Sequence, residues 1–322
     1  MFDTLPRIPL ATLPTPVEFL PRLSRALSGP RLFIKRDDLT GLAGGGNKTR
    51  KLEFLTADAL AKKADTLVTL GGAQSNHCRQ TAAAAAKTGL RCILVLRGDA
   101  PAEYAGNVLL NHLLGAEMLW SGARSREEVM DEVVATERAA GRSPYPVPLG
   151  GSTPLGAAAY VLAMQELVGQ TGESFDRVIF ASSSGGTHAG LAAGAQLTGF
   201  RGEVLGISID EKLASLQGLV ADIATGVTRL LGCPHNFTPG DIHANADYLG
   251  GGYAVMGTPE REAIDLFARC EGILLDPVYT GRAAAGMIDL IRKGVIRKGE
   301  SILFWHTGGT PALWAYARQL AL

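Results

Sequence analysis

The chain has 322 residues, and its 31 basic and 31 acidic side chains give a formal net charge of zero. This balance excludes the broad positive field of nucleic-acid and membrane-surface proteins, so the expected partner is a small molecule, with no nucleic acid and no membrane. Because a domain usually holds about 100–200 residues, two domains are expected.

The first residues, "MFDTLPRIPLATLPTPVEFL", carry an early Asp and several prolines and lack the apolar run of a secretory signal. No apolar stretch in the chain reaches the ~20 residues of a membrane helix. Cys78, Cys92, Cys233 and Cys270 share no paired metal-ligand spacing, so no metal site is expected. We therefore expect a cytoplasmic protein with reduced thiols.

Short apolar, often β-branched segments alternate along the chain with segments rich in Ala and Leu. This alternation is typical of the α/β class with largely parallel sheets. Such sheets bind ligands beyond the carboxyl ends of their strands, so functional loops should directly follow strands. The elements predicted in this way are strands at 31–38, 65–71, 91–98, 177–183, 203–209 and 301–307, with helices at 49–63 and 78–89.

The first glycine-rich segment is "GLAGGGNKTRKLEFL", residues 41–55, directly before a predicted helix. A nucleotide-binding P-loop needs glycine, four residues and then Gly-Lys-Ser/Thr. Gly41 and Gly46 have this separation, but Asn47 stands where the lysine is needed, and Lys48 comes one position late. The P-loop interpretation is therefore disfavoured, and Lys48 is a candidate for chemistry of its own.

A polar group follows the next predicted strand in "TLGGAQSNHCRQ", residues 69–80. Gln74, Ser75, Asn76 and His77 lie where a helix opens, and the free N–H groups at such a position suit a carboxylate or another anion. The plain alternative is that Ser75 is only the N-cap of the helix.

"VIFASSSGGTHAGLAAG", residues 178–194, also runs from a strand through a Gly/Ser loop into a helix. Its loop residues Ser184, Gly185, Gly186 and Thr187 can direct successive N–H groups and hydroxyls at one phosphate. The loop lacks the GxGxxG spacing of dinucleotide folds and contains no lysine, so a single phosphomonoester is expected without a lysine partner.

Two further loops, in 273–286 and 302–316, are expected to follow strands. The first presents Tyr279 and Thr280, and the second presents His306 and Thr307. Taken singly, such residues are usually structural. A lysine, a phosphate loop, an aromatic ring and hydroxyls able to meet a ring nitrogen together describe a site for pyridoxal phosphate.

These segments resemble the fold-type II pyridoxal-phosphate enzymes, the tryptophan synthase β-like group, and within it the branch of D-cysteine desulfhydrase and 1-aminocyclopropane-1-carboxylate deaminase. The resemblance implies a homodimer of two-domain, three-layer α/β/α subunits. The large domain would hold residues 1–50 and 160–322, and the inserted small domain residues 51–159. The segments that carry the resemblance are "LPTPVEFLPRLS", "IKRDDLTGLAGGGNKTRKLEFL", "GGAQSNHCRQTAAAAAKTGL", "PLGGSTPLGAAAYV", "SSSGGTHAGLAAG", "EGILLDPVYTGRAAAGMIDLI" and "ILFWHTGGTPALWAY".

The resemblance also implies roles for single residues. Lys48 is similar to the lysine that holds the cofactor covalently, and Asn76 to the residue that bonds the cofactor's 3′ oxygen. Residues 184–187 match the phosphate loop, and Tyr279 matches the aromatic residue that flanks the ring. Tyr253 matches a second tyrosine of the site.

The substrate side of the site is implied in the same way. Ser75 looks like the binder of the substrate carboxylate, with Gln74, Asn76 and His77 beside it. The freed Lys48 or a nearby tyrosine would remove the Cα proton.

Two positions separate the branches of the family. The cyclopropane-opening deaminases carry Glu and Leu where this chain has Thr280 and Thr307. A hydroxyl beside the pyridine nitrogen suits a neutral ring and a weaker electron sink, which is sufficient for eliminating a good leaving group from Cβ. The expected reaction is conversion of D-cysteine to pyruvate, ammonia and hydrogen sulfide. The open alternatives are an L-cysteate sulfo-lyase, a deaminase of the cyclopropane amino acid and a non-catalytic cofactor-binding protein.

Overall fold

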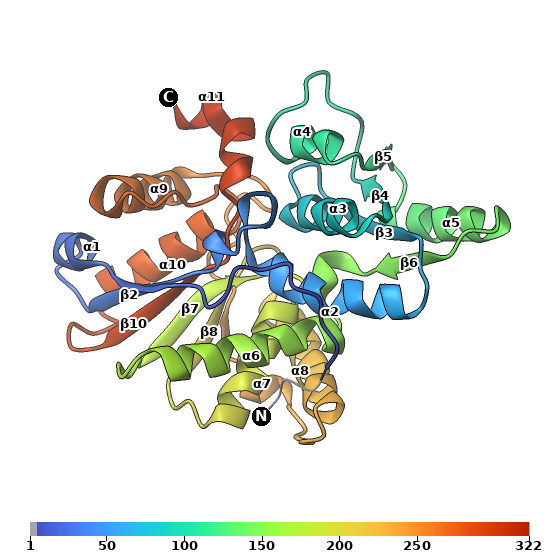
Figure 1. Cartoon of the computed structure of the whole chain (residues 1–322). Helices are drawn as coiled ribbons and strands as arrows, with labels where there is room; N and C mark the ends of the chain where they lie inside the picture. Colours follow the sequence, from blue (N-terminus) through green and yellow to red (C-terminus); the bar gives the residue numbers. More distant parts are fainter. Residues whose placement is uncertain (1–4, 322) are drawn as a thin grey trace.

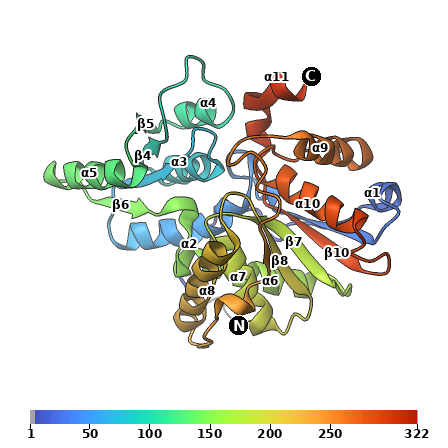
Figure 2. The same cartoon turned by 180° about the vertical axis from the view of Figure 1, so that it is seen from behind.

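The computed structural model describes residues 5–321. It contains two β-sheets, each covered by helices on both faces (Figures 1 and 2). The prediction of an α/β fold with largely parallel sheets is confirmed. No helix within the described residues has both the length and the apolar character needed to cross a membrane.

The larger sheet has six strands in the order β1-β2-β10-β7-β8-β9. Only β1 runs antiparallel to its neighbour, and the remaining neighbours are parallel. The strands are β1 (Val17–Phe19), β2 (Arg31–Arg36), β7 (Arg177–Ser182), β8 (Glu203–Ser208), β9 (Ala244–Asn245) and β10 (Ser301–His306).

The smaller sheet has four parallel strands in the order β5-β4-β3-β6. All four lie between β2 and β7 in the sequence, inside the segment 51–159 that we expect to form a small domain. The domain boundaries themselves stay a prediction. The strands are β3 (Thr66–Gly71), β4 (Arg91–Leu96), β5 (Glu117–Trp120) and β6 (Pro144–Val147).

Helices enclose each sheet. In the larger unit, α1, α9 and α10 pack on one face of the sheet and α6, α7 and α8 lie on the other side (Figure 1). In the smaller unit, α2 and α3 cover one face and α5 the other. The helices are α1 (Pro21–Ala26), α2 (Asn47–Ala61), α3 (Asn76–Thr88), α4 (Gly106–Leu113), α5 (Arg126–Ala139), α6 (Pro154–Gln170), α7 (Gly186–Thr198), α8 (Leu213–Leu230), α9 (Thr258–Glu271), α10 (Thr280–Arg292) and α11 (Ala317–Leu320).

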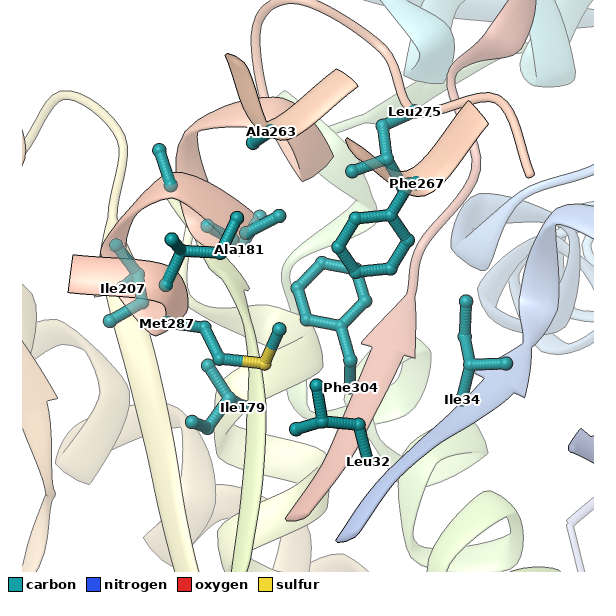
Figure 3. Packing of buried hydrophobic residues seen from close by; sticks show 14 of the residues in the cluster. Leu32, Ile34, Ile179, Ala181, Ile207, Ala263, Phe267, Leu275, Met287 and Phe304 are labelled. Carbon is teal, nitrogen blue, oxygen red and sulfur yellow. The ribbon is translucent and has the colours of Figure 1, made fainter. Parts of the chain in front are cut away.

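The strands of the larger sheet are apolar on both faces, as expected when helices cover both. On β2, Leu32 and Ile34 belong to the core under α9 and α10, whereas Phe33 belongs to the core on the other face. Figure 3 shows the first of these cores, where Phe267 of α9 lies against Phe304 of β10 with ring centroids 5.4 Å apart. Each such buried aromatic side chain contributes about 1.5–3 kcal/mol to stability.

The six predicted strands are present as β2, β3, β4, β7, β8 and β10, but the strand expected before Tyr279 is not present. Residues 273–276 instead run as irregular chain from α9 to α10. This segment cannot pair with β10, because β2 and β7 already occupy both edges of β10. Both predicted helices begin two residues earlier in the structure than expected. Lys48 and His77 therefore lie in the first turns of α2 and α3.

Candidate active site

A cavity of about 340 Å³ opens at the carboxyl ends of strands from both sheets. Loops after β3 and β4 line it from the smaller sheet, and loops after β7, β8 and β10 line it from the larger one. This is the position that parallel sheets offer to ligands. The predicted site residues that the structure brings to its wall are Lys48, Ser75, Asn76, His77, Ser184, Gly185, Thr187, Tyr253, Tyr279 and Thr307.

Lys48 is the second residue of α2 and lies half-buried in the cavity wall. The helix enters the wall through Gly46, whose φ of 128° suits glycine, and a Cβ there would lie 2.5 Å from the amide nitrogen of Gln80. Loss of hydration lowers the pKa of the Lys48 amine to about 8, although Lys51 opposes the shift through a hydrogen bond. About one tenth of the amine is therefore neutral at pH 7, and about half at pH 8, far more than for an ordinary lysine.

Lys51, one turn further along α2, is a functional candidate that the sequence interpretation missed. It is 1% exposed, and its Nζ donates to the Gly150 carbonyl at 3.2 Å and to Ser152 Oγ at 3.4 Å. A Cβ on Gly186 would lie 2.8 Å from this Nζ. The structure thus places a lysine beside residues 184–187, although the loop itself contains none; whether the phosphate has a lysine partner stays a prediction.

The loop after β7 forms a tight turn at the start of α7, a geometry that suits an anion. Gly185 is in the left-handed region with a φ of 77° and provides no side chain to cap the helix. The first N–H groups of a helix have no partner within it, so they are available to an anion. Ser152 reaches this turn from the other side, bonding Ser184 Oγ at 2.8 Å and accepting the Gly186 N–H at 3.1 Å. Thr187 Oγ1 accepts a hydrogen bond from the side chain of Asn47 at 2.9 Å.

A second helix N-terminus, that of α3, faces the same cavity. Ser75 is the N-cap, and its Oγ accepts the Cys78 N–H at 3.2 Å, so the plain structural role is present together with the position expected for a carboxylate binder. The oxygen of Asn76 accepts from Arg79 at 3.1 Å and from the Asn107 amide at 2.8 Å. The group of Asn76 that remains for a ligand is therefore its amide nitrogen.

His77 lines the cavity with one ring nitrogen buried and unpartnered, Nδ1. The Thr69 hydroxyl donates to the Val147 carbonyl at 2.7 Å, so at 2.8 Å from His77 Nε2 the same oxygen must accept. The proton is thereby assigned to Nε2, and Nδ1 carries a lone pair. Burial, reinforced by the charges of Lys48 and Lys51, holds the pKa of His77 well below its usual range, so the ring is neutral.

Two tyrosines from the larger unit complete the cavity. The hydroxyls of Tyr253 and Tyr279 lie 2.6 Å apart, and the rings meet edge to face with centroids 6.0 Å apart. Burial raises the pKa of Tyr253 to about 12 and that of Tyr279 well above its usual value, so both hydroxyls keep their protons. A Cβ on Gly72 would lie 3.2 Å from the Tyr253 ring, which shows how closely the two units approach here.

Two predicted site residues, Thr280 and Gln74, lie outside the cavity lining. Thr307 lines the cavity, whereas the buried Thr280 hydroxyl accepts the Asp276 N–H at 2.8 Å and donates to Asp276 Oδ1 at 2.7 Å. Gln74 is also outside the lining. Its amide accepts the Asn107 N–H at 2.8 Å and donates to the Ala105 carbonyl at 3.1 Å, which fixes the start of α4.

A buried polar network anchors α2 behind the cavity. Asp37 accepts hydrogen bonds from Arg50 at 2.9 Å, Tyr160 at 2.6 Å and Trp305 at 2.8 Å. Arg50 also pairs with Glu166 of α6 at 2.9 Å. The Arg50 guanidinium opposes the effect of burial and keeps the pKa of Asp37 below its usual value. Because removing one member of such a buried network leaves the others unpaired, it holds the helix of Lys48 firmly in place.

Three charged residues of the wall were not singled out from the sequence: Arg97, Arg126 and Asp210. Arg97 and Asp210 each follow a strand, β4 and β8, so the strand-end rule could have found them. Ser183 donates to Asp210 at 3.1 Å, yet burial raises the pKa of the Asp210 carboxyl. Arg126 opens α5 and carries no sequence pattern that marks it.

Comparisons with known proteins agree with this geometry. A family model described as pyridoxal-phosphate dependent enzyme matches residues 8–308. D-cysteine desulfhydrases of Salmonella typhi and Salmonella choleraesuis (strain SC-B67) are each 44% identical to the chain over 319 residues, which is 97% of this chain and 96% of each relative.

Solved structures show the same relationship. A crystal structure described as an ACC deaminase homologue superposes with a TM-score of 0.91 at 39% identity, covering 99% of this chain and 97% of the other. Threonine deaminase isoform 2 from Solanum lycopersicum gives a TM-score of 0.69 at 16% identity, with coverages of 97% and 83%, a likeness of fold alone.

Proposed function

The chain belongs to the pyridoxal-phosphate dependent enzymes, and from this premise we propose that it is a carbon–sulfur lyase that converts D-cysteine to pyruvate, ammonia and hydrogen sulfide. The observation that carries the proposal is the convergence of Lys48, the N-termini of α3 and α7 and the Tyr253–Tyr279 pair on one cavity. The full-length similarity to D-cysteine desulfhydrases supports the choice of substrate.

The residues of the cavity fit the cofactor. The open turn at Gly185, the Ser184 hydroxyl and the nearby Lys51 amine would hold its phosphate. Asn76 would donate to the 3′ oxygen, and the Thr307 hydroxyl would meet the ring nitrogen. When bound, pyridoxal phosphate supplies an aldehyde that condenses with amines and a ring that withdraws electrons from Cα.

The side chains around the substrate divide the remaining tasks. The N-terminus of α3, with Ser75 as its cap, would bind the carboxylate through free N–H groups. Lys48, with a pKa of about 8, can give up and accept a proton near neutral pH and is our candidate for the Cα base. Tyr253 and Tyr279 keep their protons and would donate hydrogen bonds to the departing sulfur.

The covalent role of Lys48 is tested by reducing the holoenzyme with borohydride and mapping the labelled peptide. We expect the label on Lys48 in the wild type and in Lys51→Arg, and none in Lys48→Ala. Lys51 is the matched control because it lies one turn away in the same helix and has a similarly depressed pKa. Label on Lys51 in the wild type would contradict the assignment.

The substrate is tested by measuring pyruvate release from D-cysteine, L-cysteine, β-chloro-D-alanine, D-serine and the cyclopropane amino acid. We expect D-cysteine and β-chloro-D-alanine to give the largest kcat/KM. Equal turnover of the cyclopropane amino acid would favour the deaminase branch and remove the argument from Thr307.

We also propose that the enzyme works in the cytoplasm as a homodimer, which rests on the family resemblance. Sedimentation of the holoenzyme as a single 33.8 kDa species would exclude the dimer.

A further inference from the structure

Arg79 of α3 is a fully buried arginine behind the wall of the cavity. Its Nη1 donates to the side-chain oxygens of Asn76 at 3.1 Å and Asn107 at 2.9 Å, and its Nη2 donates to the Gly45 carbonyl at 2.6 Å. All three acceptors are neutral, and its Nε has no partner within the described residues. The guanidinium therefore joins the starts of α3 and α4 to the loop that leads into α2.

The positive charge of Arg79 is only partly compensated by the protein. Burial lowers the pKa of Arg79 to about 10, and the charge of Asp276 opposes the shift without a hydrogen bond between the two side chains, so Arg79 is charged near neutral pH. The Asp276 carboxylate is itself occupied, since it accepts hydrogen bonds from three successive backbone N–H groups, those of residues 278–280. A buried cation without a paired anion is costly to a fold, and an anion nearby would offset this cost.

The bonds from Arg79 fix the orientation of the Asn76 amide. A guanidinium can only donate, so the Asn76 atom that faces it must be the oxygen. The Asn107 amide donates to the same oxygen at 2.8 Å. The Asn76 nitrogen is left free in the cavity wall, and no group within residues 5–321 accepts a hydrogen bond from it.

The same guanidinium is bonded to the entry of the helix that carries Lys48. Gly45, whose carbonyl accepts from Arg79, lies three residues before Lys48. The charge of Lys48 lowers the pKa of His77, the residue after Asn76, so the amine lies near the start of α3. One guanidinium thus connects the loop that precedes Lys48 with the Asn76 side chain.

We propose that Arg79 is a positioning residue that makes the cavity selective for the 3′ oxygen of the cofactor and favours the ionised form of that oxygen. The inference rests on the proposed function, in which Lys48 condenses with the cofactor's aldehyde. In pyridoxal phosphate the aldehyde and the 3′ oxygen are on adjacent ring carbons, so a cofactor held at the Lys48 amine carries that oxygen beside it. The Asn76 nitrogen, oriented by Arg79, can donate to the oxygen there, and an ionised oxygen offsets the buried charge behind Asn76.

A purely structural role for Arg79 makes a different prediction. Loss of a structural contact would loosen α3 and the loop before α2 together and weaken every ligand of the cavity alike. Loss of the proposed effect weakens only ligands that carry the 3′ oxygen. Two ligands that differ in this one atom therefore separate the two roles, in the manner of a double-mutant cycle.

The test uses the full-length apo-protein with pyridoxine 5′-phosphate and 3-deoxypyridoxine 5′-phosphate, which differ only in the 3′ oxygen. Neither ligand has an aldehyde, so condensation with Lys48 does not contribute to binding. Isothermal titration calorimetry at one pH gives both dissociation constants for the wild type, Arg79→Gln, Arg79→Lys and Asn76→Asp. Lys87→Gln is the control, because Lys87 is exposed in the last turn of the same helix.

We expect the wild type to bind the hydroxylated ligand about tenfold or more tightly than the 3-deoxy ligand, as for a charge-assisted hydrogen bond. This ratio should fall toward one in Arg79→Gln. Asn76→Asp should lower it to one or below, because the new carboxylate pairs with Arg79 and turns its second oxygen toward the ligand. Arg79→Lys keeps a cation but loses the planar fork that reaches three acceptors, so the ratio should fall several-fold there even if Arg79→Gln does not fold. Lys87→Gln should leave it unchanged.

The absorbance of the holoenzyme gives an independent measure of the charge effect. Bound pyridoxal phosphate absorbs at different wavelengths with and without a proton on its 3′ oxygen. We expect the ionised form to dominate in the wild type and the protonated fraction to grow in Arg79→Gln at the same pH. Lys87→Gln should keep the wild-type spectrum.

The possible failures are distinguishable. A wild-type ratio near one, or a ratio that the folded Arg79 variants leave unchanged, overturns the inference and leaves the proposed function standing. Equal weakening of both ligands does the same, since it shows a structural role alone. An unchanged absorbance spectrum in Arg79→Gln overturns the effect of the charge on the oxygen. A wild-type protein that binds no pyridoxal phosphate overturns the proposed function, and the inference falls with it.

Discussion

Lys48 and Lys51, one helical turn apart on α2, both line the cavity, and their different surroundings suit them to different roles. Lys51 is fully buried and bonded to the Gly150 carbonyl and Ser152, and desolvation together with the charge of Lys48 places its pKa well below the usual value. Lys48 faces the cavity with more freedom, and desolvation alone accounts for its lowered pKa. These surroundings support our proposal that Lys48 is the reactive amine and that Lys51 contacts the cofactor's phosphate at the start of α7.

The lowered pKa of Lys48 predicts a pH dependence for cofactor capture. Only the neutral amine attacks an aldehyde, so capture should accelerate as pH rises toward about 8 and level off above it. At pH 8 half of the Lys48 amines are neutral, against roughly one in several hundred for an amine with the usual pKa of 10.5. Stopped-flow absorbance of the apo-protein mixed with pyridoxal phosphate between pH 7 and 10 measures this rate. A midpoint near that of an ordinary lysine would contradict the prediction.

Helices α3 and α7 both begin just after a strand of a parallel sheet, and the glycines at these turns pack closely against neighbouring residues. Gly186, the first residue of α7, shows how close this packing is: a Cβ there would lie 2.6 Å from Ser152 Oγ and 2.8 Å from the Ser152 Cα. The turn before α7 and the loop at 150–152 thus fit together only when residue 186 has no side chain.

We therefore expect Gly186→Ala to displace the 150–152 loop and weaken cofactor binding by about tenfold or more, equivalent to ~1–3 kcal/mol of packing strain. Gly169→Ala is the control, because Gly169 lies in α6 with nothing within 4 Å of its added Cβ. It should leave the affinity unchanged and raise stability by up to ~1 kcal/mol. Titration of each apo-protein with pyridoxal phosphate, followed by absorbance, gives the dissociation constants. Equal affinities for the two variants would show that the turn tolerates a side chain.

The regular elements were predictable because each has a local pattern: apolar runs for β2, β3, β4, β7, β8 and β10, and glycine-rich loops before α2 and α7. The irregular chain before Tyr279 was not, since a buried apolar run becomes a strand only if a neighbouring strand is free to pair with it. Lys51 and Arg126 were missed for a related reason. Their roles depend on contacts with loops that are distant in the sequence, and no local sequence pattern indicates such contacts.

Several of the predicted site residues that line the cavity are in loops that directly follow a strand. Ser75, Ser184 and Thr307 lie at the cavity as predicted from this rule. Thr280 does not, because its hydroxyl is used within the turn of Asp276. Its proposed contact with the cofactor remains a prediction with less support than that of Thr307.

On the scale of the whole molecule, loops of both sheets line the cavity. The chain passes between the two sheets through α2 and α6 (Figure 1). We propose that residues 51–159 move as a unit against the larger part when substrate binds, which would exclude water from the site. The charges on opposite walls support this motion: Arg126 belongs to the smaller unit and Asp210 to the larger one, and the charge of Arg126 favours the ionised form of the Asp210 carboxyl.

This motion predicts a shorter distance between spin labels on the two units when D-alanine is added to the holoenzyme. D-Alanine has no leaving group on Cβ and cannot be eliminated. The labels would be placed on the exposed native Cys233 and on Arg124→Cys in a Cys270→Ser background, while the buried Cys78 and Cys92 remain unlabelled. Identical distance distributions with and without D-alanine, at concentrations where the cofactor absorbance shows binding, would contradict closure.

The strand order of the larger sheet also governs how the protein can be made. β10 pairs with β2 and β7, so the middle of the sheet is supplied by residues 301–306, which are synthesised after all the other strands of that sheet. The smaller sheet is complete once β6 has emerged and can form early, whereas β2 waits for β10, which follows all the other strands of the two sheets in the sequence. A message truncated before Ser301 would leave β2 and β7 with exposed edges, which are templates for aggregation. The active site therefore cannot assemble until β10 and the loop that follows it have been synthesised.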